Sequence, residues 1–138
     1  MRTMSYGVKK KKILIIEDDP VLNQGIFLAL GTAEYEIEKA FCLTEARSHD
    51  TKESFDLVIF DLNLLDSSGY DVLKEVQQES KGAIVILTTN DLEIDRITRL
   101  GLQVDDYVTK PFSLMVLRAR VEALLRRSSM ERRQKTKK

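Results

Sequence analysis

Residues 13–20 read ILIIEDDP, which places four bulky apolar residues ahead of three carboxylates and a proline. A short, continuous apolar run is typical of a parallel strand that is covered on both faces. Proline suits the first turn of a helix, so we expect a helix to begin at Pro20. The stretch therefore predicts a buried strand, an acidic turn and a helix in immediate succession, which is typical of an α/β fold.

The same succession recurs along the rest of the chain. Further strands are expected at residues 35–38, 57–60, 83–87 and 107–108, where short apolar or alternating runs occur. Intervening amphipathic segments predict helices over 44–49, after Ser67 or Ser68, from a cap at Asp91, and from a cap at Ser113 into the basic C-terminal residues. Five strands that alternate with five helices predict a doubly wound α/β domain with a five-stranded parallel sheet.

The length and composition limit the class of protein. The 138 residues are enough for one domain with a buried core and too few for two domains of ordinary size. No apolar run approaches the roughly 18 residues of a membrane span, and lysines rather than apolar residues follow the N-terminus. The single cysteine, Cys42, has no partner for an internal disulfide. These features predict a soluble, cytoplasmic domain that does not enter a membrane.

The net charge of zero conceals basic ends and an acidic body. Residues 1–12 carry five basic side chains and no acidic one, and residues 126–138 carry seven basic and one acidic. We interpret 1–12 as a basic N-terminal tail, 13–127 as the folded domain, and 128–138 as a basic linker or tail. The acidic body argues against direct binding of a nucleic-acid backbone and suits a domain that binds a cation through carboxylates.

Polar residues follow four of the five expected strands at the point where each strand ends. In an open parallel sheet the binding site forms outside the carboxyl ends of the strands, so these side chains are expected to meet. They are Glu17, Asp18 and Asp19 after the first strand, Asp61 after the third, Thr88 and Thr89 after the fourth, and Thr109, Lys110 and Pro111 after the fifth. The sequence therefore predicts an acidic site with one ammonium group at this edge of the sheet.

The chemistry of this set favours phosphoryl transfer to a carboxylate. Glu17, Asp18 and Asp61 would repel one another unless a cation or a proton lies between them. Oxygen ligands without histidine or cysteine suit Mg²⁺. A carboxylate beside Mg²⁺ can attack a phosphoryl group, and Lys110 and Thr88 are of the types that neutralise the transferred oxygens.

Four motifs in this order resemble the receiver domain of bacterial two-component response regulators. They are ILIIEDD at 13–19, DLNL at 61–64 with Gly69 nearby, LT at 87–88, and DDYVTKPF at 105–112. The similarity covers roughly residues 12–127 and implies a flavodoxin-like (βα)5 fold with strand order 2-1-3-4-5. The segment LRARVEALLRR at 117–127 resembles the winged-helix, OmpR/PhoB-type subfamily, in which a linker and a DNA-binding domain follow. That domain would lie outside these 138 residues, so contact with DNA is expected only through it.

The resemblance implies a role for each matching residue. Asp61 would accept a phosphoryl group from a sensor histidine kinase. Glu17 and Asp18 would bind Mg²⁺ together with Asp61 and the backbone carbonyl of Asn63. Lys110 would pair with the phosphoryl group. Such a domain is a signalling switch rather than an enzyme, although it assists its own aspartyl phosphorylation and dephosphorylation.

The resemblance also implies how phosphorylation changes the domain. Thr88 would hydrogen-bond to a phosphoryl oxygen, Tyr107 would turn inward as Thr88 moves, and the Lys110–Pro111 peptide bond would be cis. The fourth helix, fifth strand and fifth helix would form a homodimer on phosphorylation and thereby control transcription through the attached DNA-binding domain. Reciprocal salt bridges such as Asp106 with Arg120 would join the two copies. The expected dimer face comprises Arg96, Arg99, Asp105, Asp106, Arg118 and Arg120.

Two other functions compete with this interpretation. A phosphatase of the haloacid-dehalogenase type would need a second aspartate two residues after Asp61, where Asn63 stands. A phosphate-independent, receiver-like binding module is the alternative to a switch, because Leu65, Thr89 and the pair 103–104 depart from the family's usual residues. None of these departures removes an acidic, hydroxyl or ammonium group that is expected at the site.

Overall fold

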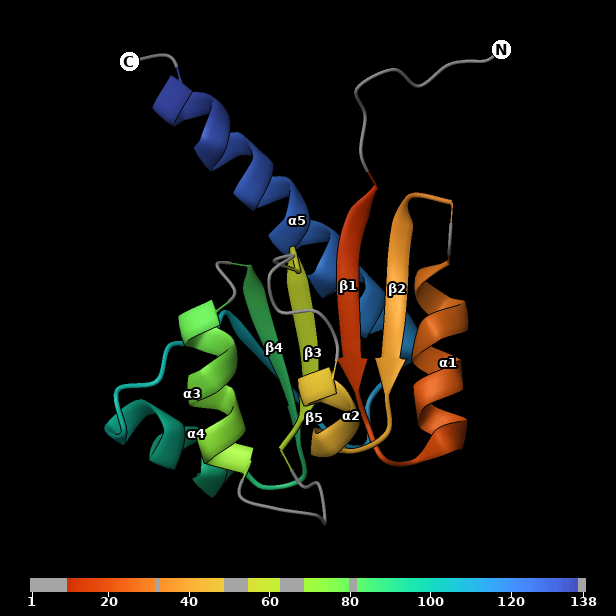
Figure 1. The fold of residues 1–138 in the computed structure, drawn as a ribbon, viewed down its shortest axis with the longest axis vertical. Coiled ribbons are helices and arrows are strands. Elements are labelled where there is room, and N and C mark those ends of the chain that lie inside the picture. Colours follow the sequence, from red (N-terminus) through yellow and green to blue (C-terminus); the bar gives the residue numbers. More distant parts are fainter. Residues whose placement is uncertain (1–9, 32, 49–54, 63–68, 80–81, 137–138) are drawn as a thin grey trace.

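The computed structural model describes residues 10–31, 33–48, 55–62, 69–79 and 82–136. Within them, five parallel strands form one sheet in the order β2-β1-β3-β4-β5 (Figure 1). The strands are β1 (Lys11–Ile16), β2 (Tyr35–Ala40), β3 (Leu57–Asp61), β4 (Ala83–Thr88) and β5 (Asp106–Thr109). The helices are α1 (Pro20–Leu30), α2 (Leu43–Ser48), α3 (Gly69–Glu79), α4 (Asp91–Arg99) and α5 (Leu114–Thr136). The predicted α/β class and strand order are confirmed.

Helices cover both faces of the sheet, which explains why its central strands are apolar throughout (Figure 1). Successive side chains of a strand point to opposite faces. In β1, Ile13 and Ile15 belong to the core that contains side chains of α1 and α5. Leu14 and Ile16 belong to the core that contains side chains of α2, α3 and α4. Burial of both faces therefore holds the three layers together and leaves the strand ends as the polar region of the sheet.

The helices that follow β1 and β5 begin as the sequence predicts. Pro20 is the first residue of α1, and Oδ1 of Asp19 accepts a hydrogen bond from the amide of Val21 at 2.9 Å. At α5, the Ser113 hydroxyl accepts a hydrogen bond from the amide of Met115 at 3.1 Å. Because each capping residue lies close after a strand, these caps define short connections at the carboxyl edge of the sheet.

The predicted cap of α4 is wrong by one residue. Asn90, rather than Asp91, precedes the helix in an extended conformation, and its Oδ1 accepts a hydrogen bond from the amide of Leu92 at 2.9 Å. Asparagine is as good a cap as aspartate, so sequence preference alone does not choose between the two neighbours. The predicted caps Ser67 and Ser68 lie outside the described residues.

Two elements extend into the segments that we interpret as basic tails. β1 begins at Lys11, because the amide of Lys12 donates to the Asp56 carboxylate and the Asp56 amide donates to the Lys12 carbonyl, both at 2.8 Å. α5 continues to Thr136 and projects beyond the sheet in Figure 1. Its last turns contain neither proline nor glycine, so nothing in the local sequence ends the helix earlier. In the described part of the chain, neither α5 nor any other helix is apolar enough to cross a membrane.

Candidate functional site

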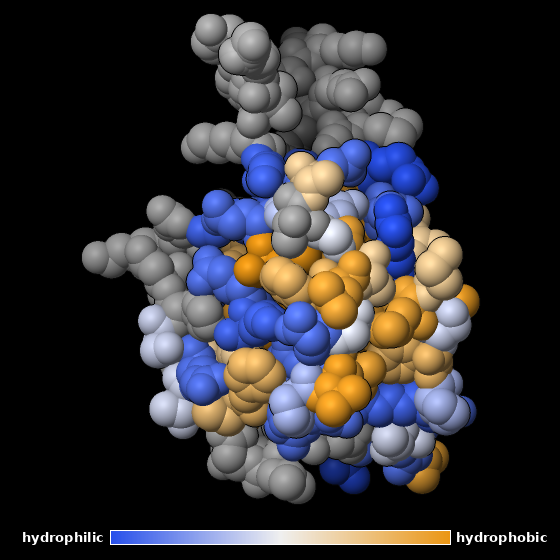
Figure 2. Space-filling view, turned by 90° about the vertical axis from the view of Figure 1, so that its right-hand side faces the viewer, coloured by the Kyte–Doolittle hydropathy of each residue, from blue (hydrophilic) through white to orange (hydrophobic). Residues whose placement is uncertain are grey.

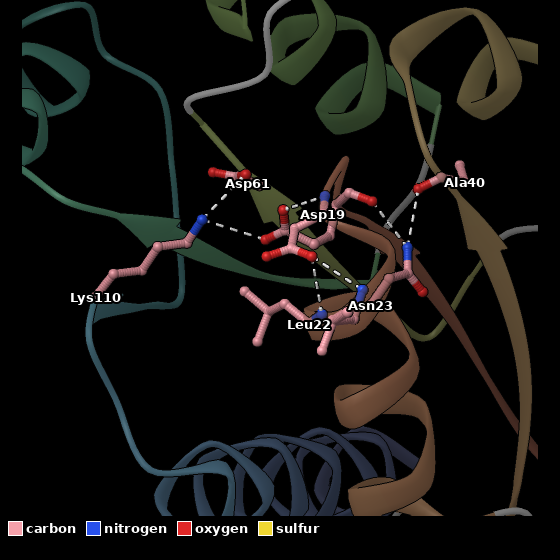
Figure 3. Close-up of polar contacts among 8 residues, drawn as sticks. Asp19, Leu22, Asn23, Ala40, Asp61 and Lys110 are labelled. Atoms are coloured by element: carbon pink, nitrogen blue, oxygen red, sulfur yellow. Dashed lines mark hydrogen bonds and ion pairs between the residues drawn. The ribbon is translucent and has the colours of Figure 1, made fainter.

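The carboxyl edge of the sheet brings together an ammonium group and two buried carboxylates. Lys110, which follows β5, places its Nζ 3.2 Å from Oδ2 of Asp61 at the end of β3 (Figure 3). The same Nζ lies 3.3 Å from Oε1 of Glu17, which follows β1. Glu17 is completely buried and Asp61 is 1% exposed. Three segments that are remote in the sequence therefore meet at one polar site.

Asp18 adds a third carboxylate to this site. Carboxylate oxygens of Glu17, Asp18 and Asp61 all lie within 4.8 Å of one another. Oε1 of Glu17 is buried and accepts no hydrogen bond in the described part of the chain, although the Lys110 ammonium is within ion-pair distance. When the three carboxylates are ionised, one ammonium group leaves the site negative. Hard divalent cations prefer such an oxygen-only donor set, so the residues present fit Mg²⁺.

The surroundings of Glu17 oppose its ionisation, whereas those of Lys110 favour its positive charge. The pKa of Glu17 is raised from 4.5 to about 7, chiefly by burial and also by the neighbouring Asp61. The amide of Asp19, which donates to Oε2 at 3.0 Å, and the Lys110 ammonium limit this rise. Burial lowers the pKa of Lys110, but attraction by Asp61 and Glu17 outweighs burial, so that pKa is raised overall. Lys110 therefore stays cationic at neutral pH.

Asn23 in α1 takes part in the architecture of the site, although the sequence analysis did not single it out. Its side chain is fully buried, and Nδ2 donates to the backbone carbonyls of Glu17 at 3.0 Å and Ala40 at 3.2 Å (Figure 3). The available signal was an amide at helical spacing from Ile26 and Leu30, which form the buried face of α1. A polar residue on an apolar face needs a partner, and here the partners are the ends of two strands.

Thr88 and Tyr107 occupy neighbouring strands on the α4 side of the site. Thr88 is buried, and its hydroxyl accepts a hydrogen bond from the amide of Asn90 at 3.1 Å and donates to the Asn90 carbonyl at 3.3 Å. Tyr107 is half-buried and packs against the core beneath α4. Burial raises the pKa of the Tyr107 hydroxyl, and a hydrogen bond with Thr98 of α4 partly offsets this rise. Thr88 is thus joined to the start of α4, and Tyr107 to its body.

The predicted site also includes the Lys110–Pro111 peptide bond, Asn63 and Thr89. The Lys110–Pro111 peptide bond is cis. Asn63 lies outside the described residues. Thr89 is exposed and lines a pocket of about 630 Å³ beside Lys110, between α1 and the segment that follows β5.

Four of the six charged residues expected at a dimer face form ion pairs within the single chain. Arg120 Nη1 lies 2.8 and 3.0 Å from the two carboxylate oxygens of Asp106, and Arg127 lies 3.6 Å from Asp105. Asp105 also accepts a hydrogen bond from the amide of Ile84 at 2.7 Å. The pair expected between two copies is therefore already satisfied in one copy. Arg118 lies 3.2 Å from Glu122, one turn further along α5, and Arg96 and Arg99 are exposed.

Comparison with known proteins agrees with this fold. The family model of the response regulator receiver domain matches residues 13–122. Transcriptional regulatory protein PmrA of Pectobacterium parmentieri is 39% identical over 118 residues, which cover 85% of this chain and 53% of that protein. Transcriptional regulatory protein BasR of Escherichia coli strain K12 is 39% identical over 117 residues, which cover 84% of this chain and 53% of that protein. The chain thus spans about half the length of the curated relatives it matches.

A solved structure supports the same relationship. The response regulator DrrB, described as a Thermotoga maritima OmpR/PhoB homolog, matches with a TM-score of 0.73 and 28% identity, over 87% of this chain and 54% of that one. Fold and strand-end site together define an α/β domain of the doubly wound class. Since the receiver-domain model covers most of its length, the chain belongs to the response regulator receiver domain family of two-component systems. The relatives PmrA and BasR are transcriptional regulators.

Proposed function

We propose that this domain is the phosphoacceptor switch of a two-component system, in which Asp61 receives a phosphoryl group from a sensor histidine kinase. The observation that carries the proposal is the 3.2 Å contact between Lys110 Nζ and Asp61 Oδ2 beside the buried Glu17. Glu17, Asp18, Asp61 and the backbone carbonyl of Asn63 would hold Mg²⁺. When bound, this ion supplies positive charge to the transferred phosphoryl oxygens.

For this transfer the protein has to supply only a nucleophile and positive charge close to it. An oxygen of Asp61 attacks the phosphorus atom, and the bond between phosphorus and the kinase's histidine nitrogen breaks. Negative charge on the phosphoryl oxygens opposes this approach, so positioned positive charge lowers the barrier. The Lys110 ammonium is already adjacent to Asp61 and can pair with these oxygens without a large movement. Attack of water on the same phosphorus atom reverses the modification and releases inorganic phosphate.

The phosphodonor approaches from the side of α1. The pocket beside Lys110 is lined there by Leu22 and Gly25. Apolar side chains gather on the face of the molecule that carries α1 (Figure 2), where Val21 and Leu28 are 80% and 66% exposed. Apolar side chains that gather into one exposed patch are typical of a protein contact. In this proposal the kinase packs on α1 while its phosphohistidine faces Lys110.

Phosphorylation alters the domain through Thr88. A hydroxyl that hydrogen-bonds to a phosphoryl oxygen cannot also keep both of its present bonds to Asn90. The bond that Thr88 donates to the Asn90 carbonyl is the one lost, and because Asn90 is the cap of α4, its loss loosens the start of that helix. Tyr107 then moves further into the space behind Thr88, which shifts the equilibrium between two arrangements of α4.

The output of the proposed switch is a homodimer through the face formed by α4, β5 and α5. In the dimer, Asp106 of each copy would pair with Arg120 of the other copy instead of with Arg120 of its own chain. The number of ion pairs would therefore be the same in the dimer as in two separate monomers. The matched residues span about half the length of these relatives, which are named as transcriptional regulators. A DNA-binding domain attached after α5 would turn dimerisation into control of transcription in the cytoplasm.

The test is formation of the aspartyl adduct. The wild-type domain and Asp61→Asn are incubated with Mg²⁺ and acetyl phosphate, and intact mass is measured before and after hydroxylamine. We expect a hydroxylamine-labile phosphoryl adduct on the wild type and none on Asp61→Asn. Asp71→Asn removes an exposed carboxylate from α3 and should retain the adduct. Absence of the adduct on the wild type would favour the phosphate-independent binding module, and rapid turnover of small phosphate esters would favour a phosphatase.

A further inference from the structure

A buried amide in α1 connects the ends of two strands at the site. Asn23 is completely buried, and its Nδ2 donates to the carbonyl of Glu17 at 3.0 Å and to that of Ala40 at 3.2 Å (Figure 3). Glu17 directly follows β1, and Ala40 is the last residue of β2. Both partners are acceptors, so only the nitrogen of the amide can face them. The orientation of Asn23 is therefore determined by its surroundings.

The oxygen of the same amide, Oδ1, does not take part in this connection. Oδ1 of Asn23 is buried and accepts no hydrogen bond in the described part of the chain. A buried amide oxygen without a partner is unfavourable, whereas leucine, whose side chain branches in the same way, would have no such atom. The neighbouring inward positions of α1, Ile26 and Leu30, are apolar. Packing alone would favour an apolar residue at this position, so the two bonds donated by Nδ2 are what asparagine contributes.

Those two bonds act on the backbone that carries the acidic side chains. The carbonyl of Glu17 belongs to the peptide bond that joins Glu17 to Asp18, so its orientation limits how both residues are presented. The amide of Glu17 donates to the Ala40 carbonyl at 3.0 Å, which holds the preceding peptide bond as well. Oε2 of Glu17 accepts from the amide of Asp19 at 3.0 Å. Asn23 thus closes a network that leaves Oε1 of Glu17 directed at Lys110, with a Glu17 carboxylate oxygen within 4.8 Å of one from Asp61.

We infer that Asn23 is a positioning residue for the candidate magnesium site, which it serves by fixing the Glu17–Asp18 peptide through its side-chain amide. The inference rests on the proposed function, because it requires that Glu17 and Asp18 bind the ion. Hydrogen-bond partners behind metal ligands commonly contribute about 10- to 100-fold to metal affinity. Asn23 itself does not contact the ion and contributes no ligand.

The experiment compares Asn23→Leu with Ile26→Val, a matched buried substitution one turn further along α1 that leaves the network intact. The dissociation constant for Mg²⁺ is measured by NMR titration of the backbone amides, and hydrogen exchange of the Glu17 amide is measured in metal-free buffer. We expect Asn23→Leu to fold, to bind Mg²⁺ at least about tenfold more weakly, and to exchange the Glu17 amide faster. Ile26→Val should keep the wild-type affinity even though it loses stability. Asn23→Ala is the second variant, in case leucine does not fit.

Two outcomes separate the inference from the proposed function. If the wild type binds Mg²⁺ and both Asn23 variants fold and bind it with unchanged affinity, Asn23 is only a structural residue and the inference is overturned. If the wild type shows no titration by Mg²⁺ at all, the proposed function itself fails, and the inference fails with it. A loss of affinity that Ile26→Val shares would also overturn the inference, because destabilisation alone would then explain it.

Discussion

Lys110 and Glu17 show how strongly the charge of one group at this site depends on another. Glu17 has no solvent exposure, and its nearest cation, Lys110, is shared with Asp61. Burial disfavours an ionised carboxylate more than a shared ammonium group favours it, so the pKa of Glu17 is raised to about 7. Near neutral pH, the metal-free site is therefore stabilised by a proton on Glu17. A divalent cation would replace that proton.

This balance predicts how stability depends on pH without metal. The pKa of Glu17 is about 7 in the folded state and 4.5 in the unfolded state. Between these values the folded state binds more protons, so stability is greatest below pH 4.5 with respect to this group and falls as the pH rises through 7. The fall amounts to about 3 kcal/mol at most. Urea unfolding in chelator between pH 5 and 8 measures it, and Glu17→Gln should flatten the profile.

Added Mg²⁺ provides the complementary half of that measurement. Because the ion binds the ionised carboxylate, its affinity should rise over the same range of pH in which metal-free stability falls. A metal-free stability that rises from pH 5 to 8, in the wild type but not in Glu17→Gln, would contradict the raised pKa of Glu17.

Among the elements, the connection into β4 illustrates a constraint that comes from backbone packing. Gly82 immediately precedes β4, and the amide of Ala83 donates to the Asp56 carbonyl at 3.0 Å. A Cβ atom built on Gly82 would overlap the backbone carbonyls of Phe55 and Asp56, just ahead of β3. The two strands that end in Asp61 and Thr88 can therefore pair at their starts only if this position lacks a side chain.

Alanine at position 82 should accordingly destabilise the domain. We expect Gly82→Ala to lower the free energy of unfolding by about 1–3 kcal/mol, because backbone atoms must shift to remove the overlap. Gly25→Ala is the matched control: its Cβ would lie 3.4 Å from the flexible end of Leu114, within a helix, where alanine is favoured over glycine by about 1 kcal/mol. Urea unfolding should move in opposite directions for the two variants. Equal effects would show that close approach of the backbone is not the cause.

For the whole molecule, the face formed by α4, β5 and α5 is the surface that we propose for contact with a second copy. Arg120 and Asp106 are 47% and 27% exposed in their side chains, so their 2.8 Å ion pair is partly exposed to solvent. Solvated pairs of this kind contribute little to stability. In the proposed switch, the same two residue types could therefore pair between copies at small cost.

Replacement of Arg120 should therefore separate folding from assembly. Arg120→Ala is expected to change the free energy of unfolding by less than about 0.5 kcal/mol. In the same variant, the dimer formed in Mg²⁺ and beryllofluoride should weaken, as measured by sedimentation. Lys74→Ala, an exposed change on α3, should leave assembly unaffected. A dimer that forms equally well in Arg120→Ala would show that this face does not mediate the contact.

The local sequence was sufficient for the fold class and for most of the candidate site. Apolar runs that serve both faces of a sheet are a local property, and so is the presence of Asp61 and Lys110 immediately after two of them. The rule that parallel strands end at one edge then predicts that such residues meet. The cap of α4 and the ends of β1 and α5 were less predictable, because neighbouring residues have similar preferences there.

The amino-acid sequence by itself determined the alternation of strands and helices and the kinds of charged group at the strand ends. The tertiary structure decided the rest: that Asn23 spans two strand ends, that Asp106 pairs with Arg120 of its own chain, and that Glu17 is shielded from water. Each depends on the distance between segments far apart in the sequence and on which neighbours exclude solvent. Neither quantity is encoded in the residues on either side of a given position.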